Sequence, residues 1–214
     1  YYFDRGYEIY WPITKRFAPL LDPLDYVNSI ILNDDLLHHD WLKSDVMKII
    51  PLIPFADKVV NLADRGPHPT AETPPKNFEQ CKYRVAEVSI ENKHKLEWSR
   101  NTDREDSLYD MVVGDKKNYA FCHLTSSRND RAEMPEFDGD VVEASEIDGY
   151  SIYDWYKVIK SASAIYCVES AIHQFIDGFV PTLLNTTCYT LPRGAYQKKG
   201  GDCYSPFWDK RHMT

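Results

Sequence analysis

One stretch, DWYKVIKSASAIYCVESAIHQFIDGF at residues 154–179, constrains the fold more than any other, because a short apolar run separates two helical patterns. Before the run, apolar residues recur with the spacing i, i+3, i+4, i+7 from Trp155 to Ala162, and the same spacing returns after it. The run itself, residues 164–168, is apolar throughout, as expected of a parallel strand covered on both faces. This order of helix, buried strand and helix predicts an α/β protein with a parallel sheet.

Two polar residues, Glu169 and Ser170, come directly after this predicted strand. Open α/β sheets bind ligands at the carboxyl ends of their strands, so we expect both residues to lie at a binding site. A carboxylate at a helix start repels phosphate but accepts hydrogen bonds from neighbouring hydroxyls, which favours a ribose or a sugar ring beside Glu169. Alternatively, Ser170 caps the next helix, Glu169 favours its dipole, and neither binds a ligand. His173 lies one turn into that helix, and we expect it on the side away from the apolar stripe.

A second polar loop follows the predicted strand at residues 119–124. It supplies three hydroxyls and one guanidinium, those of Thr125, Ser126, Ser127 and Arg128. With the local backbone amides, these groups have the composition of a cradle for a diphosphate. A solvated turn, in which serine and asparagine side chains bond to their own backbone, explains the same composition.

Other motifs carry less chemistry. The loop at residues 148–155 offers aromatic rings that could stack on a base, although Trp155 also fits the apolar stripe of its helix. The sequence contains neither the glycine-rich dinucleotide pattern nor a P-loop. His38 and His39 lack the i, i+4 spacing that places two imidazoles on one helix face, and we predict no metal site. Cys122 and His123 are neighbours on a predicted strand, so their side chains should point to opposite faces and not form a nucleophilic pair.

The composition excludes one class of partner. A net charge of −8 argues against a nucleic acid, whose phosphates require a basic patch. The five cysteines are odd in number and never form a CxxC pair, which indicates reduced thiols and a cytoplasmic protein. No run approaches the roughly 20 apolar residues of a transmembrane helix. The first residue is not methionine, so we expect upstream residues to be missing.

The chain is predicted to form two α/β regions. Strands are expected at residues 7–11, 27–32, 58–62, 119–124, 140–144, 164–168 and 180–191. Further helices are expected at residues 14–21, 40–50, 77–88 and 103–113. A proline-rich loop, residues 64–76, cannot continue a sheet. We therefore divide the chain into an amino-terminal α/β region at 1–95, a ligand-binding domain at 96–192 and an irregular tail at 193–214.

Taken together, these residues resemble the carboxyl-terminal half of GT-B glycosyltransferases, particularly heptosyltransferase-like sequences. FCHLTSSR matches the strand that ends in a small hydroxyl-rich loop, and DWYKVIKSASAIYCVESAIHQFIDGF matches the later helix, strand, acidic-serine elbow and helix. YEIYWPITKRFAPLLDPLDYVNSII is similar to a strand and helix of the amino-terminal half. The resemblance covers residues 7–62 and 96–185.

The resemblance implies two Rossmann-like α/β/α halves with parallel sheets, the amino-terminal one small or truncated. It implies transfer of a sugar from a nucleotide-sugar donor to a glycan or other hydroxyl acceptor, without an obligatory metal or other cofactor. By position, the hydroxyl-rich loop would meet the diphosphate, Glu169 the ribose or sugar hydroxyls, and Ser170 and His173 the phosphate edge. The usual Gly-Gly or Asp-Ser-Gly elbow is replaced here by Glu169-Ser170-Ala171.

The catalytic base is unknown, since Asp4 and Glu8 lie in the half that should supply it but match no motif. Two alternatives to an enzyme therefore stay open. One is a non-catalytic protein that binds a sugar nucleotide or carbohydrate. The other is a structural α/β domain whose aromatic surface binds a protein partner.

Overall fold

The computed structural model describes residues 2–15, 17–32, 51, 54–60, 78–125, 131–183, 186–191 and 207–210. The chain divides into two compact units, the first formed by residues 1–92 with 97–99 and the second by residues 93–96 with 100–214. The boundary predicted between residues 95 and 96 falls in the segment where the chain passes from one unit to the other. The predicted helix at 40–50 and the predicted loop at 64–76 lie outside the described residues.

The first unit contains a pair of parallel strands, β1 (Ile9–Thr14) and β2 (Val27–Leu32). The second of these was predicted with the same bounds. β1 begins and ends later than predicted and includes Pro12, which a strand tolerates where its N–H is not needed by a neighbour. The predicted helix at 14–21 is wrong, because β1 continues to Thr14 and only a short 3₁₀ turn, η2 (Ala18–Leu20), follows.

The remaining described elements of this unit are η1 (Phe3–Arg5), the helix α2 (Phe78–Val85) and most of η5 (Ile90–His94). α2 lies within the predicted helix at 77–88. Residues 58–60, the described part of the predicted strand at 58–62, are not in a strand.

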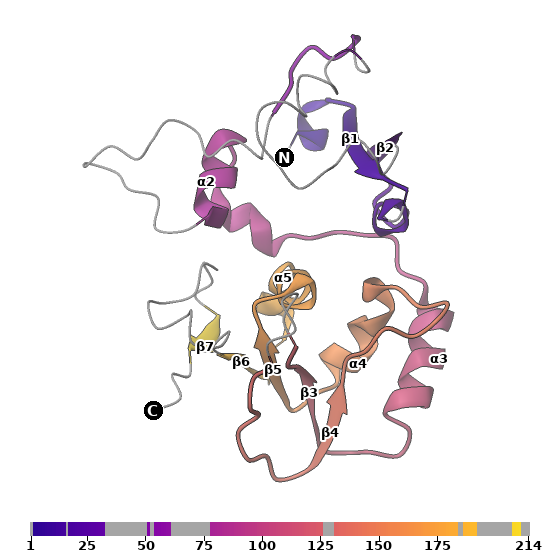
Figure 1. Ribbon diagram of the computed structural model, residues 1–214, viewed down its shortest axis with the longest axis vertical. Helices are drawn as coiled ribbons and strands as arrows, with labels where there is room; N and C mark the ends of the chain where they lie inside the picture. Colours follow the sequence, from indigo (N-terminus) through magenta and orange to yellow (C-terminus); the bar gives the residue numbers. More distant parts are fainter. Residues whose placement is uncertain are drawn as a thin grey trace, which may run out of the picture. The chain divides into compact units, whose positions relative to one another are not determined.

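The second unit is built on a five-stranded parallel sheet with the strand order β4-β3-β5-β6-β7 (Figure 1). Its strands are β3 (Tyr119–His123), β4 (Asp140–Glu143), β5 (Ala164–Val168), β6 (Thr187–Leu191) and β7 (Trp208–Lys210). Its helices and 3₁₀ turns are α3 (Thr102–Val112), η6 (Ile152–Trp155), α4 (Tyr156–Lys160), α5 (Ala171–Asp177) and η7 (Val180–Thr182). Numbered within the unit, the order is 2-1-3-4-5, one of the two common orders of doubly wound sheets. The predicted α/β class with a parallel sheet is confirmed.

Two expectations for this unit need correction. The predicted strand at 180–191 is a strand only from Thr187, because η7, which contains Pro181, forms first. The tail expected to be irregular contributes β7, which pairs with β6 through Cys188 and Trp208. The sheet therefore gains a strand that the sequence pattern did not show.

Side chains alternate between the two faces of this sheet. On one face, the ring of Phe121 packs against Trp155 at 5.9 Å, and the hydroxyl of Tyr119 donates a hydrogen bond to the carbonyl of Val158 at 2.6 Å. Helical segments thus cover this face. The opposite face has an apolar cluster covered by an extended segment of the β3–β4 connection. That cluster comprises Ala120, Cys122, Leu124, Ala164, Tyr166, Val168 and Leu191, with Ala132, Met134, Phe137 and Tyr189 packed on it.

A buried polar cluster joins the first residues of the second unit to the end of α5. The side chains of Lys93 and Asp177 form an ion pair and are 4% and 0% exposed. Trp208 Nε1 donates a hydrogen bond to Asp177 Oδ1 at 3.1 Å, and His94 Nδ1 lies 2.8 Å from the carbonyl oxygen of Asp177. Next to it, Gly178 lies so close to Leu96 that an added Cβ would be 2.7 Å from the Leu96 Cβ. These contacts hold residues 93–96 in the second unit, which contains the five-stranded sheet and is called the sheet unit below.

Three described cysteines, Cys122, Cys167 and Cys188, are free and buried in this unit. Burial raises the pKa of Cys122 and Cys188 to about 12. An unfolded thiol ionises at roughly pH 8.5, so between that pH and about 12 the folded chain holds more protons than the unfolded one. The stability of the fold must therefore fall as the pH rises through this window.

This linkage gives a testable result. We expect the free energy of unfolding, measured with urea and a reducing agent, to fall between pH 8 and pH 10.5. The Cys122→Ala/Cys188→Ala variant should show a shallower fall, because it lacks two of the groups that release protons on unfolding. An equal slope in the two proteins would contradict this assignment of the thiols.

Among the described helices, none is long and apolar enough to cross a membrane.

Candidate functional site

The strand order defines a topological switch point between β3 and β5. From β3 the chain goes to β4 on one side, and from β4 it returns past β3 to β5 on the other. The two central strands are neighbours, with His123 paired to Cys167, and both are parallel. Thr125 follows β3 and Glu169 follows β5 at the same edge of the sheet. In open α/β sheets ligands bind at this position, and the two loops selected from the sequence begin there.

The loop after β3 is closed at its neck. Thr125 and Arg131 form an antiparallel bridge, and the backbone N–H of Ala132 donates to the carbonyl of Leu124 at 2.9 Å. Ser126, Ser127 and Arg128, three of the predicted ligand residues, lie outside the described residues. The structure thus defines the base of the predicted diphosphate cradle.

Arg131 is a charged group at this edge that sequence reasoning missed. Its guanidinium donates to both carboxylate oxygens of Glu143, at 2.5 and 2.7 Å, and to Thr125 Oγ1 at 3.3 Å. The side chain remains 55% exposed. Hydrogen bonding by Arg131 holds the pKa of Glu143 below its usual value, so the pair is charged at neutral pH. The only sequence signal was a second arginine at the far end of TSSRNDR, and its partner on β4 could not be known without the strand order.

The three predicted site residues after β5 differ in their burial and in their contacts. Glu169 is 6% exposed at the end of the strand. Ser170 is the N-cap of α5, and its hydroxyl accepts a hydrogen bond from the backbone N–H of His173 at 3.2 Å. His173 is fully buried, since its ring stacks on Trp208 at 4.1 Å and its Nε2 lies 3.2 Å from Thr190 Oγ1. His173 was expected on the side away from the apolar stripe; that side is buried rather than exposed, because Trp208 of β7 covers the ring.

His123, the last residue of β3, was not predicted as a ligand residue. Its side chain is partly exposed, but its Nδ1 is buried and has no hydrogen-bond partner. Burial lowers the pKa of His123, and the charge of Glu143 opposes this only in part, so the imidazole is neutral at pH 7. Cys122 belongs to the apolar cluster of the opposite face, which confirms that the two neighbours point apart.

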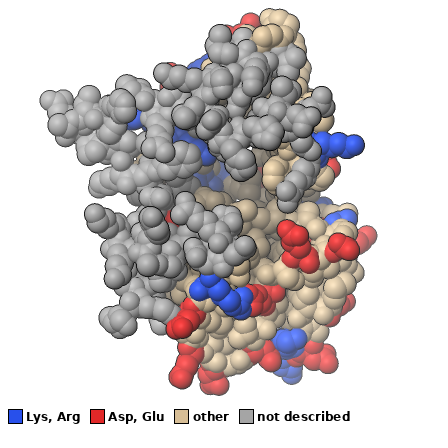
Figure 2. Space-filling view, in the orientation of Figure 1, with Lys and Arg blue, Asp and Glu red and all other residues tan. Residues whose placement is uncertain are grey.

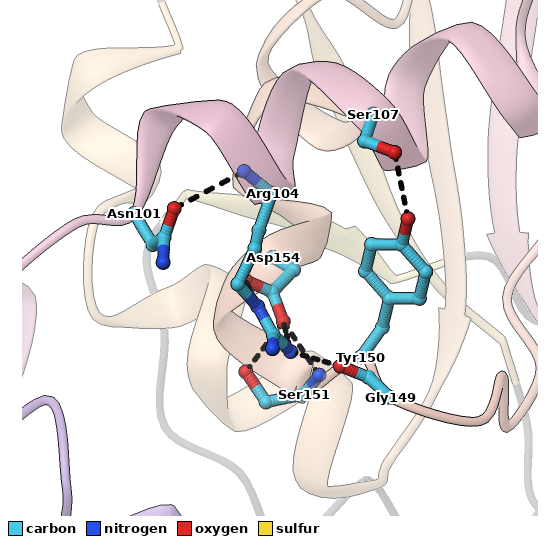
Figure 3. Close-up of polar contacts among 7 residues, drawn as sticks. All are labelled: Asn101, Arg104, Ser107, Gly149, Tyr150, Ser151 and Asp154. Carbon is cyan, nitrogen blue, oxygen red and sulfur yellow. Dashed lines mark hydrogen bonds and ion pairs between the residues drawn. The ribbon is translucent and has the colours of Figure 1, made fainter.

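Residues of the loop before η6, and Asp154 within η6, form hydrogen bonds to side chains of α3 (Figure 3). Arg104 of α3 donates to Asp154 through Nε at 3.1 Å and Nη2 at 2.7 Å, and Nη2 also bonds to the carbonyl of Gly149. The hydroxyl of Tyr150 bonds to Ser107 at 2.8 Å. Trp155 is buried. These contacts favour the structural interpretation of this loop, which holds α3 against η6.

Asp154 is the centre of that arrangement. Its carboxylate accepts hydrogen bonds from Arg104 and from the backbone N–H and hydroxyl of Ser151. Ser151 and Asp154 also form the capping box of η6. Burial alone would raise the pKa of Asp154, but the hydrogen bonds outweigh it and hold the pKa below its usual value.

Charged side chains of both signs are mixed on the described surface. On the face drawn in Figure 2, the basic side chains of the described surface are scattered beside carboxylates and form no continuous patch. In the part of the chain that the structure describes, no three histidine, cysteine, aspartate or glutamate side chains gather as metal ligands. His38 and His39 lie outside that part.

Fold and site together define an α/β protein with polar residues at the switch point of a parallel sheet. Comparison of the chain with protein-family models, with curated proteins and with solved structures gives no significant match.

Proposed function

We propose that this chain is a GT-B-like glycosyltransferase that binds a nucleotide-sugar donor at the carboxyl edge of its five-stranded sheet. The observation that carries the proposal is the strand order, because it places the switch point between the hydroxyl-rich loop and Glu169. The first unit, with its parallel pair β1 and β2, is assigned to the acceptor side.

The chemistry of this edge of the sheet supports this assignment. In sugar transfer, the bond from the anomeric carbon to the diphosphate breaks while a bond to the acceptor oxygen forms, and the acceptor proton passes to a base. The departing diphosphate gains charge, which the guanidinium of Arg131 and the amides of the 125–131 loop would stabilise. The carboxylate of Glu169 would accept hydrogen bonds from ribose or sugar hydroxyls.

The proposal is tested by thermal-shift measurement with UDP-, GDP-, ADP- and CMP-linked sugars. A ligand at 100 times its Kd stabilises the folded protein by about 2.7 kcal/mol, so one of these donors should raise the melting temperature clearly. Glu169→Gln should weaken that donor by about 1.5–3 kcal/mol, roughly tenfold to a hundredfold. The control is Thr187→Val, an exposed residue at the opposite edge of the same sheet. No shift with any donor would contradict the proposal.

A second candidate is binding of a sugar nucleotide without catalysis. It rests on the catalytic base, because Asp4 and Glu8 match no motif that would identify one. Turnover separates the two functions: release of free nucleotide in the presence of sugar acceptors, or by slow hydrolysis, identifies the transferase. Saturable binding with no nucleotide released identifies the binding protein.

A further inference from the structure

His123 differs from the other two described histidines of its unit. His94 lies against the carbonyl of Asp177, and His173 is buried between Thr190 and Trp208, so both serve the packing of the unit. His123 has a buried Nδ1 with no partner, which is costly by about 1–3 kcal/mol for a polar atom withdrawn from water. A histidine with a purely structural role normally forms a hydrogen bond through at least one ring nitrogen. The lack of such a bond calls for a functional explanation.

Its position supplies that explanation. His123 ends the central strand β3 at the switch point, beside β5. It pairs with Cys167 of β5, and Glu169 follows the end of that strand at the same edge of the sheet. Since Nδ1 is buried and the side chain is partly exposed, the distal edge of the ring, which carries Nε2, is the edge open to a ligand.

We propose that His123 is a ligand-contacting residue at this edge of the sheet, whose Nε2 hydrogen-bonds to a ribose or sugar hydroxyl of the nucleotide sugar. The inference rests on the proposed function and names the group of the ligand that is recognised. No carboxylate orients the ring through Nδ1, the arrangement that a histidine base requires, so the role is binding.

The surroundings select a hydroxyl over a phosphate. The carboxylate of Glu169 after β5 lies at this edge and would repel a phosphate at the imidazole, whereas the charge of Glu143 is compensated by Arg131. The third titratable neighbour, Cys167, is fully buried, and burial keeps its thiol protonated with a raised pKa. A neutral imidazole suits a hydroxyl, which donates or accepts according to the tautomer. The phosphates are left to Arg131.

The test uses two amide variants that differ in reach. Glutamine places its amide nitrogen near the position of Nε2, whereas asparagine reaches only the position of Nδ1. We expect His123→Gln to bind the donor found by thermal shift within about threefold of wild type, and His123→Asn to bind it about tenfold more weakly. Titration calorimetry gives both affinities, and urea unfolding checks that the two variants fold.

The hydroxyl is identified with deoxy analogues of the same donor. For the analogue that lacks the contacted hydroxyl, wild type and His123→Asn should bind equally, because the interaction is already absent. If both variants and wild type bind the donor equally, or both variants lose affinity alike, the His123 inference fails and the proposed function stands. If wild type binds no nucleotide sugar, the proposed function fails and this inference fails with it.

Discussion

Lys93→Met is expected to lower the free energy of unfolding of the sheet unit by about 3–5 kcal/mol. The methionine fills similar space but leaves the carboxylate of Asp177, which is fully buried, without its cation. The remaining contacts of Asp177 Oδ1, from Trp208 Nε1 at 3.1 Å and His94 Nδ1 at 3.6 Å, do not replace a full charge. Urea unfolding followed by tryptophan fluorescence measures the change.

The matched control is Lys157→Met in the same unit. Lys157 pairs with Asp106 at 2.8 Å, but these side chains are 38% and 59% exposed, so the loss should stay within about 1 kcal/mol. The double variant Lys93→Met/Asp177→Leu should lose less than the sum of the two single losses, since it removes the unpaired charge. Equal, small losses for Lys93→Met and Lys157→Met would show that the buried pair does not hold residues 93–96 in place.

Elements whose pattern is local were predictable from the sequence. The apolar run at 164–168 was recognised with both its ends as in β5, because a fully buried parallel strand is apolar throughout. The helix expected at 103–113 is α3, shifted by one residue, with Asn101 as its N-cap. Gly114, where that helix was expected to stop, adopts a positive φ of 55°. The stop at Gly114 was a local sequence signal, which made the end of this helix predictable.

Features that depend on strand order were not predictable. The salt bridge between Arg131 and Glu143 requires β4 to lie beside β3, and no local sequence pattern indicates this pairing. The burial of His173 depends on a three-residue strand with one apolar side chain, which is too short to show a period. His123 was considered only beside Cys122, its sequence neighbour, whereas the sheet pairs it with Cys167. The two loops of the candidate ligand site could therefore be predicted from the sequence. The contacts of its residues across neighbouring strands could not, because they depend on the strand order.

Trp208→Ala tests the strand that the sequence did not show, and we expect it to cost about 3–5 kcal/mol. The indole is 5% exposed, stacks on His173 at 4.1 Å and donates to Asp177, so its loss leaves a cavity and an unpaired carboxylate oxygen. Phe207→Ala is the control, because this neighbouring ring is 45% exposed and should cost much less. Trp208→Phe separates the two contributions, since it keeps a ring against His173 but lacks the N–H, and we expect an intermediate loss of about 1–3 kcal/mol. If Trp208→Ala and Phe207→Ala are equally mild, β7 does not contribute to the stability of the sheet, and the burial of His173 must have another cause.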